Sequence, residues 1–204
     1  MRRSMTKSSN LSKKIFSAET EEIVKDIFVR AGKFKAEAES ILSKYKIPLT
    51  IEEAGKLIEN TFFRFHKVAL EIRKRHGERD TLQIKDEYDV QDLLRGLLRM
   101  HFDDVRREER TPSFAGKSAS IDLFLKQKQI AIETKMTRNG LDEKKLGDEL
   151  IIDIAHYQKH QKVKFLYCFV YDPKARISNP VGFERDLSRK HEKLDVRVFI
   201  MPRT

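Results

Sequence analysis

Two short apolar segments that carry acidic side chains constrain this chain more than any other feature. The first is Ile121-Asp122-Leu123, and Glu133-Thr134-Lys135 begins ten residues after its end. Successive side chains of a β-strand point to opposite faces, so Glu133 and Lys135 share one face while Thr134 lies on the other. A carboxylate and an ammonium group on one face of an apolar strand are costly to bury without a compensating use. The pattern therefore predicts two strands that form a chemical site.

The residue types at this site are those that hold a hard divalent cation. Carboxylate and carbonyl oxygens are preferred ligands of Mg²⁺, so we expect Asp122, Glu133 and the backbone carbonyl of Thr134 to bind the metal, with Mn²⁺ as a substitute. Lys135 would orient or deprotonate the attacking water and offset negative charge on a phosphate. These roles predict metal-dependent hydrolysis of phosphodiester bonds.

The charge balance favours a polyanionic partner. The chain of 204 residues has 42 Lys and Arg against 32 Asp and Glu, a net charge of +10, which suits nucleic acid. A single cysteine, Cys168, excludes an intrachain disulfide and fits a reducing compartment. The sequence shows neither a secretory signal nor an apolar run long enough to span a membrane. We therefore expect a cytoplasmic protein with no membrane partner.

The N-terminal part is predicted to be helical. Residues 1–12 form a small, polar, basic tail that we expect to be disordered. Residues 13–80 form a helical hairpin that Pro48 interrupts, and Thr50 with Glu53 is a capping box at the start of the second helix. The apolar face of this hairpin must be covered, either by the rest of the chain or by a second copy.

Residues 81–204 are predicted to form an α/β domain. The expected order is αβββαβ followed by αβ, which describes a mixed sheet flanked by helices. The predicted elements are a helix over 89–102, a strand within 102–118, strands over 119–125 and 129–136, a helix over 142–161, a strand over 163–171, a short helix within 179–190 and a strand over 196–200.

These segments also resemble a known family. Ser120-Ile121-Asp122-Leu123 with Glu133-Thr134-Lys135 is similar to the motif of the PD-(D/E)XK nucleases, although the initial proline of that motif is absent. From about residue 86 to 187 the chain resembles the nuclease domain of the DpnII and MboI type of restriction endonuclease. The matching phrases are Asp86-Glu87-Tyr88-Asp89-Val90-Gln91-Asp92-Leu93-Leu94, His101-Phe102-Asp103-Asp104-Val105, Thr111-Pro112-Ser113-Phe114-Ala115-Gly116, Leu150 to His160, and Val170-Tyr171-Asp172-Pro173.

The resemblance implies a restriction-endonuclease-like core and Mg²⁺-dependent cleavage of nucleic acid, with DNA favoured and a role in restriction or phage defence. Asp122, Glu133 and Lys135 match the catalytic positions of the family. The residues that it implies as support are an acidic residue on the first core helix, Asp89 or Asp92, and Tyr157 with Gln158 on the later helix. The helical N-terminal part does not carry the resemblance, so no target sequence is transferred.

The remaining expectations concern partners. Lys117, Arg138 and Lys159 flank the site and are candidates for contacts with backbone phosphates. Cutting a duplex usually takes two copies of a single-site domain, which predicts a homodimer, and a partner protein could supply targeting. Two alternatives stay open: a nucleic-acid-binding or regulatory module with an inactive nuclease fold, and an RNA-directed nuclease. The sequence offers no aromatic platform that would separate DNA from RNA.

Overall fold

The computed structural model describes residues 20–37, 49–110, 120–141 and 143–203. The chain divides into two units, Met1–Leu49 and Thr50–Thr204. In the first unit, residues 20–37 form a helix, labelled here by its residue numbers. The expected tail over 1–12 lies outside the described residues, and the expected boundary between residues 80 and 81 falls inside the second unit.

The second unit begins with a long helix, α2 (Ile51–Arg73), which starts where the sequence predicts. The Thr50 side chain accepts a hydrogen bond from the Glu53 N–H, and the Glu53 carboxylate accepts one from the Thr50 N–H. This capping box satisfies two backbone groups that a helix start leaves without partners. After α2, Gly77 has a φ of +70° within the short 3₁₀ turn η1 (His76–Glu78), a conformation that favours glycine.

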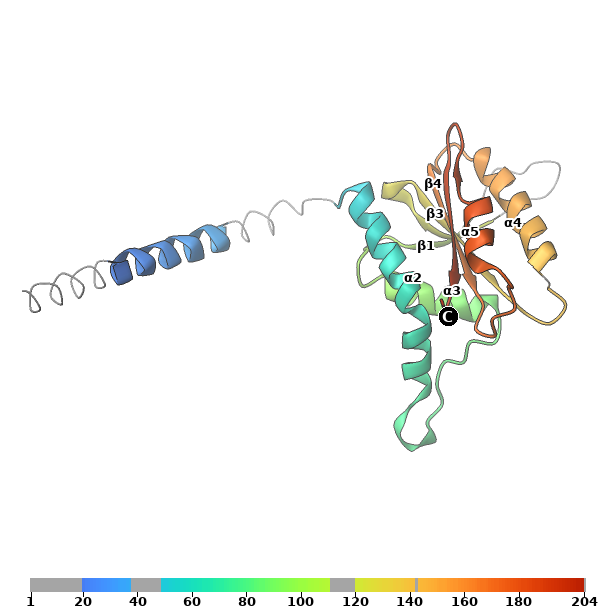
Figure 1. Ribbon diagram of the computed structural model, residues 1–204, viewed down its shortest axis with the longest axis horizontal. Helices are drawn as coiled ribbons and strands as arrows, with labels where there is room; N and C mark the ends of the chain where they lie inside the picture. Colours follow the sequence, from blue (N-terminus) through green and yellow to red (C-terminus); the bar gives the residue numbers. More distant parts are fainter. Residues whose placement is uncertain (1–19, 38–48, 111–119, 142, 204) are drawn as a thin grey trace, which may run out of the picture. The chain divides into compact units, whose positions relative to one another are not determined.

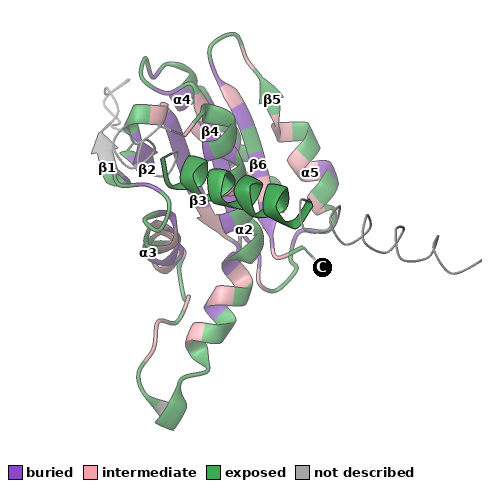
Figure 2. Cartoon of the chain, turned by 90° about the vertical axis from the view of Figure 1, so that its left-hand side faces the viewer, coloured by how far each residue is buried: buried purple, intermediate pink, exposed green. Residues whose placement is uncertain are grey.

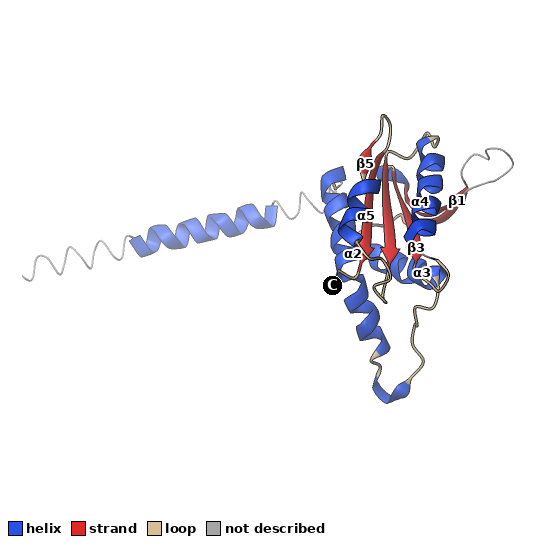
Figure 3. Cartoon of the chain, turned by 45° about the vertical axis from the view of Figure 1, so that its right-hand side comes forward, coloured by secondary structure: helices blue, strands red, loops and turns tan. Residues whose placement is uncertain are grey.

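The other helices and strands follow in the predicted order (Figures 1 and 3). They are α3 (Glu87–Leu98), β1 (Arg106–Arg110), β2 (Ser120–Leu125), the turn η2 (Lys126–Lys128), β3 (Ile130–Met136), α4 (Glu143–Gln158), β4 (Phe165–Tyr171), α5 (Pro180–Leu187), β5 (Arg189–Lys190) and β6 (Asp195–Met201). The αβββαβ core and the αβ extension are as expected, and the short β5 is an addition.

The strands form one mixed six-stranded sheet in the order β1-β2-β3-β4-β6-β5. The first three strands pair antiparallel, β3, β4 and β6 pair parallel, and β5 pairs antiparallel with β6. Helix α4 makes the crossover from β3 to β4, as a parallel pair requires. This crossover brings α4 over the strand that carries Glu133 and Lys135.

Both faces of the sheet are covered by helices (Figure 2). On one face, aromatic side chains of α2 pack on those of β4 and β6, with Phe62 at a ring-centroid distance of 4.6 Å from Phe169 and 5.5 Å from Phe199. On the other face, α4 and α5 cover an apolar cluster that includes Cys168 and Val198. Helix α2 is therefore part of the core of this unit, so its apolar face is covered by the chain's own sheet.

Candidate active site

Asp122 lies where two paired strands separate. The register between β2 and β3 runs from Leu125 opposite Ile130 to Leu123 opposite Ile132. One residue further along, the Asp122 carboxylate accepts hydrogen bonds from the Thr134 backbone N–H and from its hydroxyl group, both at 2.8 Å and both on Oδ2. Burial raises the pKa of Asp122, although these hydrogen bonds oppose the effect. The carboxylate thus replaces a strand partner and is held in a fixed position.

Glu133 is the central carboxylate of the site and is 6% exposed. Its Oε1 accepts a hydrogen bond of 2.9 Å from Lys135 Nζ, and its Oε2 accepts one of 2.7 Å from the Tyr157 hydroxyl of α4. Burial, reinforced by the charge of Asp122, raises the pKa of Glu133 to about 8. The structure therefore brings together Asp122, Glu133, Lys135 and Tyr157, four of the residues that the sequence analysis named.

Lys135 is held between two carboxylates. Its Nζ lies 2.9 Å from Glu133 Oε1 and 2.9 Å from Asp153 Oδ2, and its side chain is 12% exposed. Burial alone would lower the pKa of Lys135, but the two carboxylates raise it above its usual range. In this arrangement the lysine is a cation, so the charge-offsetting role expected for it fits the structure better than the role of a base.

Two acidic residues of the site were missed by the sequence analysis. Asp153 of α4 is one turn before Tyr157 and directs its carboxylate to Lys135. Glu87 opens α3, where burial raises its pKa, Asp122 adds to the effect, and Lys135 and the Met136 N–H oppose it. The sequence signal for Asp153 was its place, as an acidic residue, among the apolar positions of an amphipathic helix. No comparable sequence signal marked Glu87.

The acidic residues proposed for the first core helix have other partners. Asp86, not Asp89, is the N-cap of α3, and the Asp89 carboxylate accepts hydrogen bonds from the backbone of Lys85 and Asp86. Asp92 is exposed and forms an ion pair with Arg107 of β1. Glu87 is therefore the residue of α3 whose electrostatic partners belong to the site.

Among the remaining candidates, the structure describes Arg138, Lys159 and Gln158. Arg138 is exposed just after β3 and acts electrostatically on Glu87. The Gln158 amide nitrogen Nε2 lies at hydrogen-bond distance, 2.9 Å, from His191 Nδ1. Together with Lys159, Gln158 lines a cavity of about 660 Å³ at the β5–β6 turn. Lys117 lies outside the described residues.

The donor set suits a divalent cation, although the side chains are not arranged as a ligand shell. Among the described residues, no group of three or more His, Cys, Asp or Glu side chains is positioned to hold a metal ion. Glu87, Asp122, Glu133 and Asp153 nevertheless interact electrostatically around the ammonium of Lys135. Four carboxylates against one lysine leave an excess of negative charge, and hard oxygen donors are those that Mg²⁺ prefers.

Comparison with models of protein families shows the family to which the chain belongs. A family model for the DpnII–MboI restriction endonucleases matches residues 56–203. The chain belongs to the DpnII–MboI restriction endonuclease family. Membership supports a nuclease that acts on DNA. The match begins inside α2, so the family region extends further towards the N-terminus than the resemblance from residue 86 suggested.

Searches of curated proteins and of solved structures returned no match. Within the part of the chain that the structure describes, no helix is long and apolar enough to cross a membrane.

Proposed function

We propose that this member of the DpnII–MboI family is a Mg²⁺-dependent endonuclease that cuts DNA in restriction or phage defence. The proposal rests on one observation. The carboxylates of Asp122 and Glu133 come from neighbouring strands and lie close together beside Lys135. The Asp122 carboxylate is fixed by Thr134, and Glu133 is fixed by Lys135 and Tyr157. A site held this firmly is suited to a charged transition state.

The protein groups have separable roles in the proposed reaction. Asp122, Glu133 and the Thr134 carbonyl would hold Mg²⁺, with Mn²⁺ as a substitute. When bound, the cation neutralises charge on the phosphate and lowers the pKa of water. Lys135 offsets the negative charge that develops on the phosphate oxygens. Tyr157 holds the Glu133 carboxylate, and Asp153 orients Lys135 from the opposite side.

Substrate and partners extend the same proposal. Arg138 and Lys159 are exposed cations that would contact backbone phosphates, and Lys117 would add a third. Two copies would cut the two strands of a duplex, and a partner protein could direct the enzyme to its target. A restriction role places the enzyme in the cytoplasm, where incoming DNA is met.

Cleavage of plasmid DNA tests the proposed chemistry. Wild-type protein should cut with Mg²⁺ or Mn²⁺ and should not cut in EDTA. Asp122→Asn, Glu133→Gln and Lys135→Met should each lower the rate by about 100-fold or more, whereas Asp92→Asn should leave it unchanged because Asp92 pairs with Arg107 at the surface. Cutting that survives in Asp122→Asn and Glu133→Gln would place the chemistry elsewhere.

Asp153 has a matched control on its own helix. Asp153→Asn should lower the cleavage rate by about 10-fold, because Lys135 loses one of the two carboxylates that orient it. Asp148→Asn changes an exposed aspartate of α4 and should have no effect. The positioning role also predicts a changed pH profile in Asp153→Asn, which a purely structural role would not produce.

The same assay separates the two rival functions. A structured RNA that is cut faster than plasmid DNA by the wild type, and not by Glu133→Gln, would identify an RNA-directed nuclease. Equal DNA binding by wild type and Glu133→Gln, with no cleavage of either nucleic acid, would identify a binding module.

A further inference from the structure

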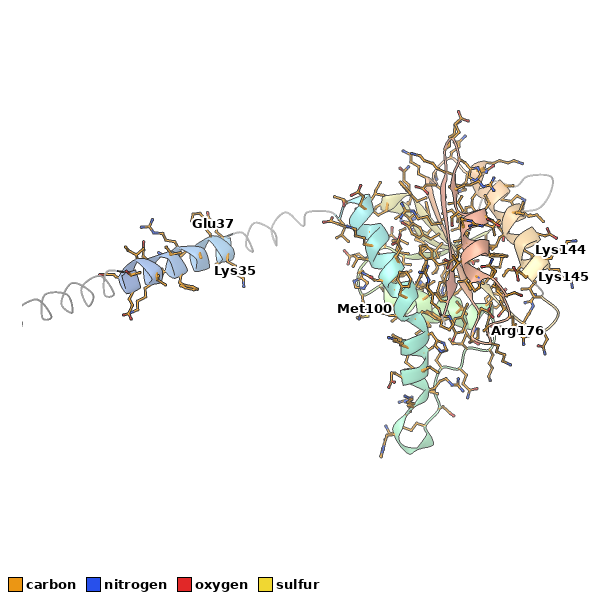
Figure 4. The ribbon with its side chains drawn as sticks, in the orientation of Figure 1. Lys35, Glu37, Met100, Lys144, Lys145 and Arg176 are labelled. Carbon is orange, nitrogen blue, oxygen red and sulfur yellow. The ribbon has the colours of Figure 1, made fainter. Side chains whose placement is uncertain are left out.

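The helix over residues 20–37 exposes a broad apolar face. The exposed fractions are 60% for Ile23, 58% for Ile27, 74% for Phe28 and 72% for Phe34. At about 100° of rotation per residue, these side chains point into one arc of the helix surface together with Val24 and Ala31. Figure 2 shows this helix exposed along its length, and Figure 4 shows its side chains. An apolar face of this size usually marks an interaction surface.

The charges of the same helix are divided between its two ends. The first half has three carboxylates and one lysine, a net charge of −2, and the second half has three basic side chains and one glutamate, a net charge of +2. The residues are Glu21, Glu22, Lys25 and Asp26 in the first half and Arg30, Lys33, Lys35 and Glu37 in the second. This division also favours the helix itself, because acidic residues suit its N-terminus and basic residues its C-terminus.

We propose that this helix pairs antiparallel with the same helix of a second copy of the chain. In an antiparallel pair the acidic half of each helix faces the basic half of the other, whereas a parallel pair would place like charges together. The apolar arcs then cover each other. This inference rests on the proposed endonuclease only in its purpose, since two joined copies would present two sites to the two strands of a duplex.

The length of the helix limits the area of the interface and therefore how tightly two copies can associate. Eighteen residues span about 27 Å, so the interface lies at the small end of the range for specific contacts. We therefore expect a dimer of the 204-residue chain that dissociates at micromolar concentrations, on the order of 1–100 µM.

Sedimentation of the 204-residue chain over that concentration range measures the association directly. Ile27→Glu and Phe34→Glu should each raise the dissociation constant by about 10-fold or more, because a charge enters the covered arc. Val29→Glu is the matched control: Val29 is 57% exposed and lies about 200° around the helix from Ile27. Circular dichroism should show equal helix content in the three variants. A wild-type monomer throughout, or a dimer that persists in Ile27→Glu and Phe34→Glu, overturns the proposal.

Disulfide formation tests the orientation. In an antiparallel pair Ile23 of one helix lies opposite Phe34 of the other, so a mixture of Ile23→Cys and Phe34→Cys proteins should form a mixed disulfide under mild oxidation. The native Cys168 is buried in the sheet and would not compete. If Ile23→Cys alone forms a disulfide-linked dimer more readily than the mixture, the helices are parallel and the proposal is wrong.

Cleavage assays distinguish a failure of the helix-pairing proposal from a failure of the nuclease proposal. Ile27→Glu should still nick one strand of a plasmid but should lose concerted cutting of both strands. Glu133→Gln should lose cleavage and remain a dimer. An inactive wild-type dimer would refute only the nuclease, and an active wild-type monomer would refute only the pairing.

Discussion

Replacing Glu133 by glutamine should stabilise the metal-free protein at alkaline pH. Burial, reinforced by Asp122, raises the pKa of Glu133 from 4.5 to about 8. The folded protein therefore retains a proton that the unfolded chain has released, and stability is lost as the pH rises from about 4.5 towards 8. Glutamine is neutral across this range. Its carbonyl oxygen can accept from Lys135 and its amide can donate to the Tyr157 oxygen, so both contacts are kept.

The expected gain follows from the same values. A change from 4.5 to about 8 sets a ceiling of about 5 kcal/mol, since each pH unit corresponds to about 1.4 kcal/mol. The lost ion pair between Glu133 and Lys135 opposes this gain, because Lys135 then keeps only Asp153 as an ionic partner. We therefore expect Glu133→Gln to raise the free energy of unfolding by about 1–3 kcal/mol above pH 8, and by little near pH 5.

Urea denaturation in EDTA at several pH values between about 5 and 9 measures this gain. Glu192→Gln, a change of an exposed glutamate in the β5–β6 turn, is the control and should follow the wild type. The reasoning is refuted if Glu133→Gln is no more stable than the wild type at the alkaline end. Mg²⁺ should reverse the order of stability, because the wild type gains binding energy that the variant lacks.

Three further changes have expected outcomes in the same denaturation assay. Tyr157→Phe removes the donor to Glu133 Oε2 and should cost about 1–2 kcal/mol near pH 9, above the Glu133 pKa of about 8, where the carboxylate is charged; no loss there would contradict the hydrogen bond. Asp172→Ala should cost about 3 kcal/mol, because this buried carboxylate accepts from a hydroxyl group and two backbone N–H groups; Asp172→Asn should recover part of the loss. Thr50→Ala should cost about 1 kcal/mol through the lost cap of α2, and a neutral effect would mean that the cap is replaced.

The parts of the fold that could be predicted from sequence are those that local chemistry decides. The capping box of Thr50 and Glu53 spans four residues and fixes the start of α2 wherever the helix packs. The alternation around Glu133 likewise gives β3 and the face on which its carboxylate lies. Both signals act within one element, so they survive without knowledge of the rest of the chain.

Contacts between elements could not be read in this way. Asp153 reaches Lys135 only because the crossover places α4 over β3. Its place among the apolar positions of α4 indicates that it faces inward, but not which side chain it meets. Helix α2 shows an apolar face in sequence, but whether that face meets the sheet or another copy depends on aromatic partners more than a hundred residues away, such as Phe169. The sequence therefore left open whether the rest of the chain or a second copy covers this face, and the structure shows the sheet against α2.

The core contacts of α2 offset part of the destabilisation that the charged site causes. Three buried or half-buried carboxylates near Lys135, those of Glu87, Asp122 and Glu133, lower stability in the absence of a cation, because burial disfavours their charged forms. On the opposite face of the same sheet, Phe62 and Phe65 are fully buried against Phe169. Buried aromatic contacts are among the largest contributions to a core. A bound cation would remove this destabilisation, and the fold would then depend less on the α2 contacts. We therefore expect that shortening α2 unfolds the metal-free protein more readily than the Mg²⁺-bound one.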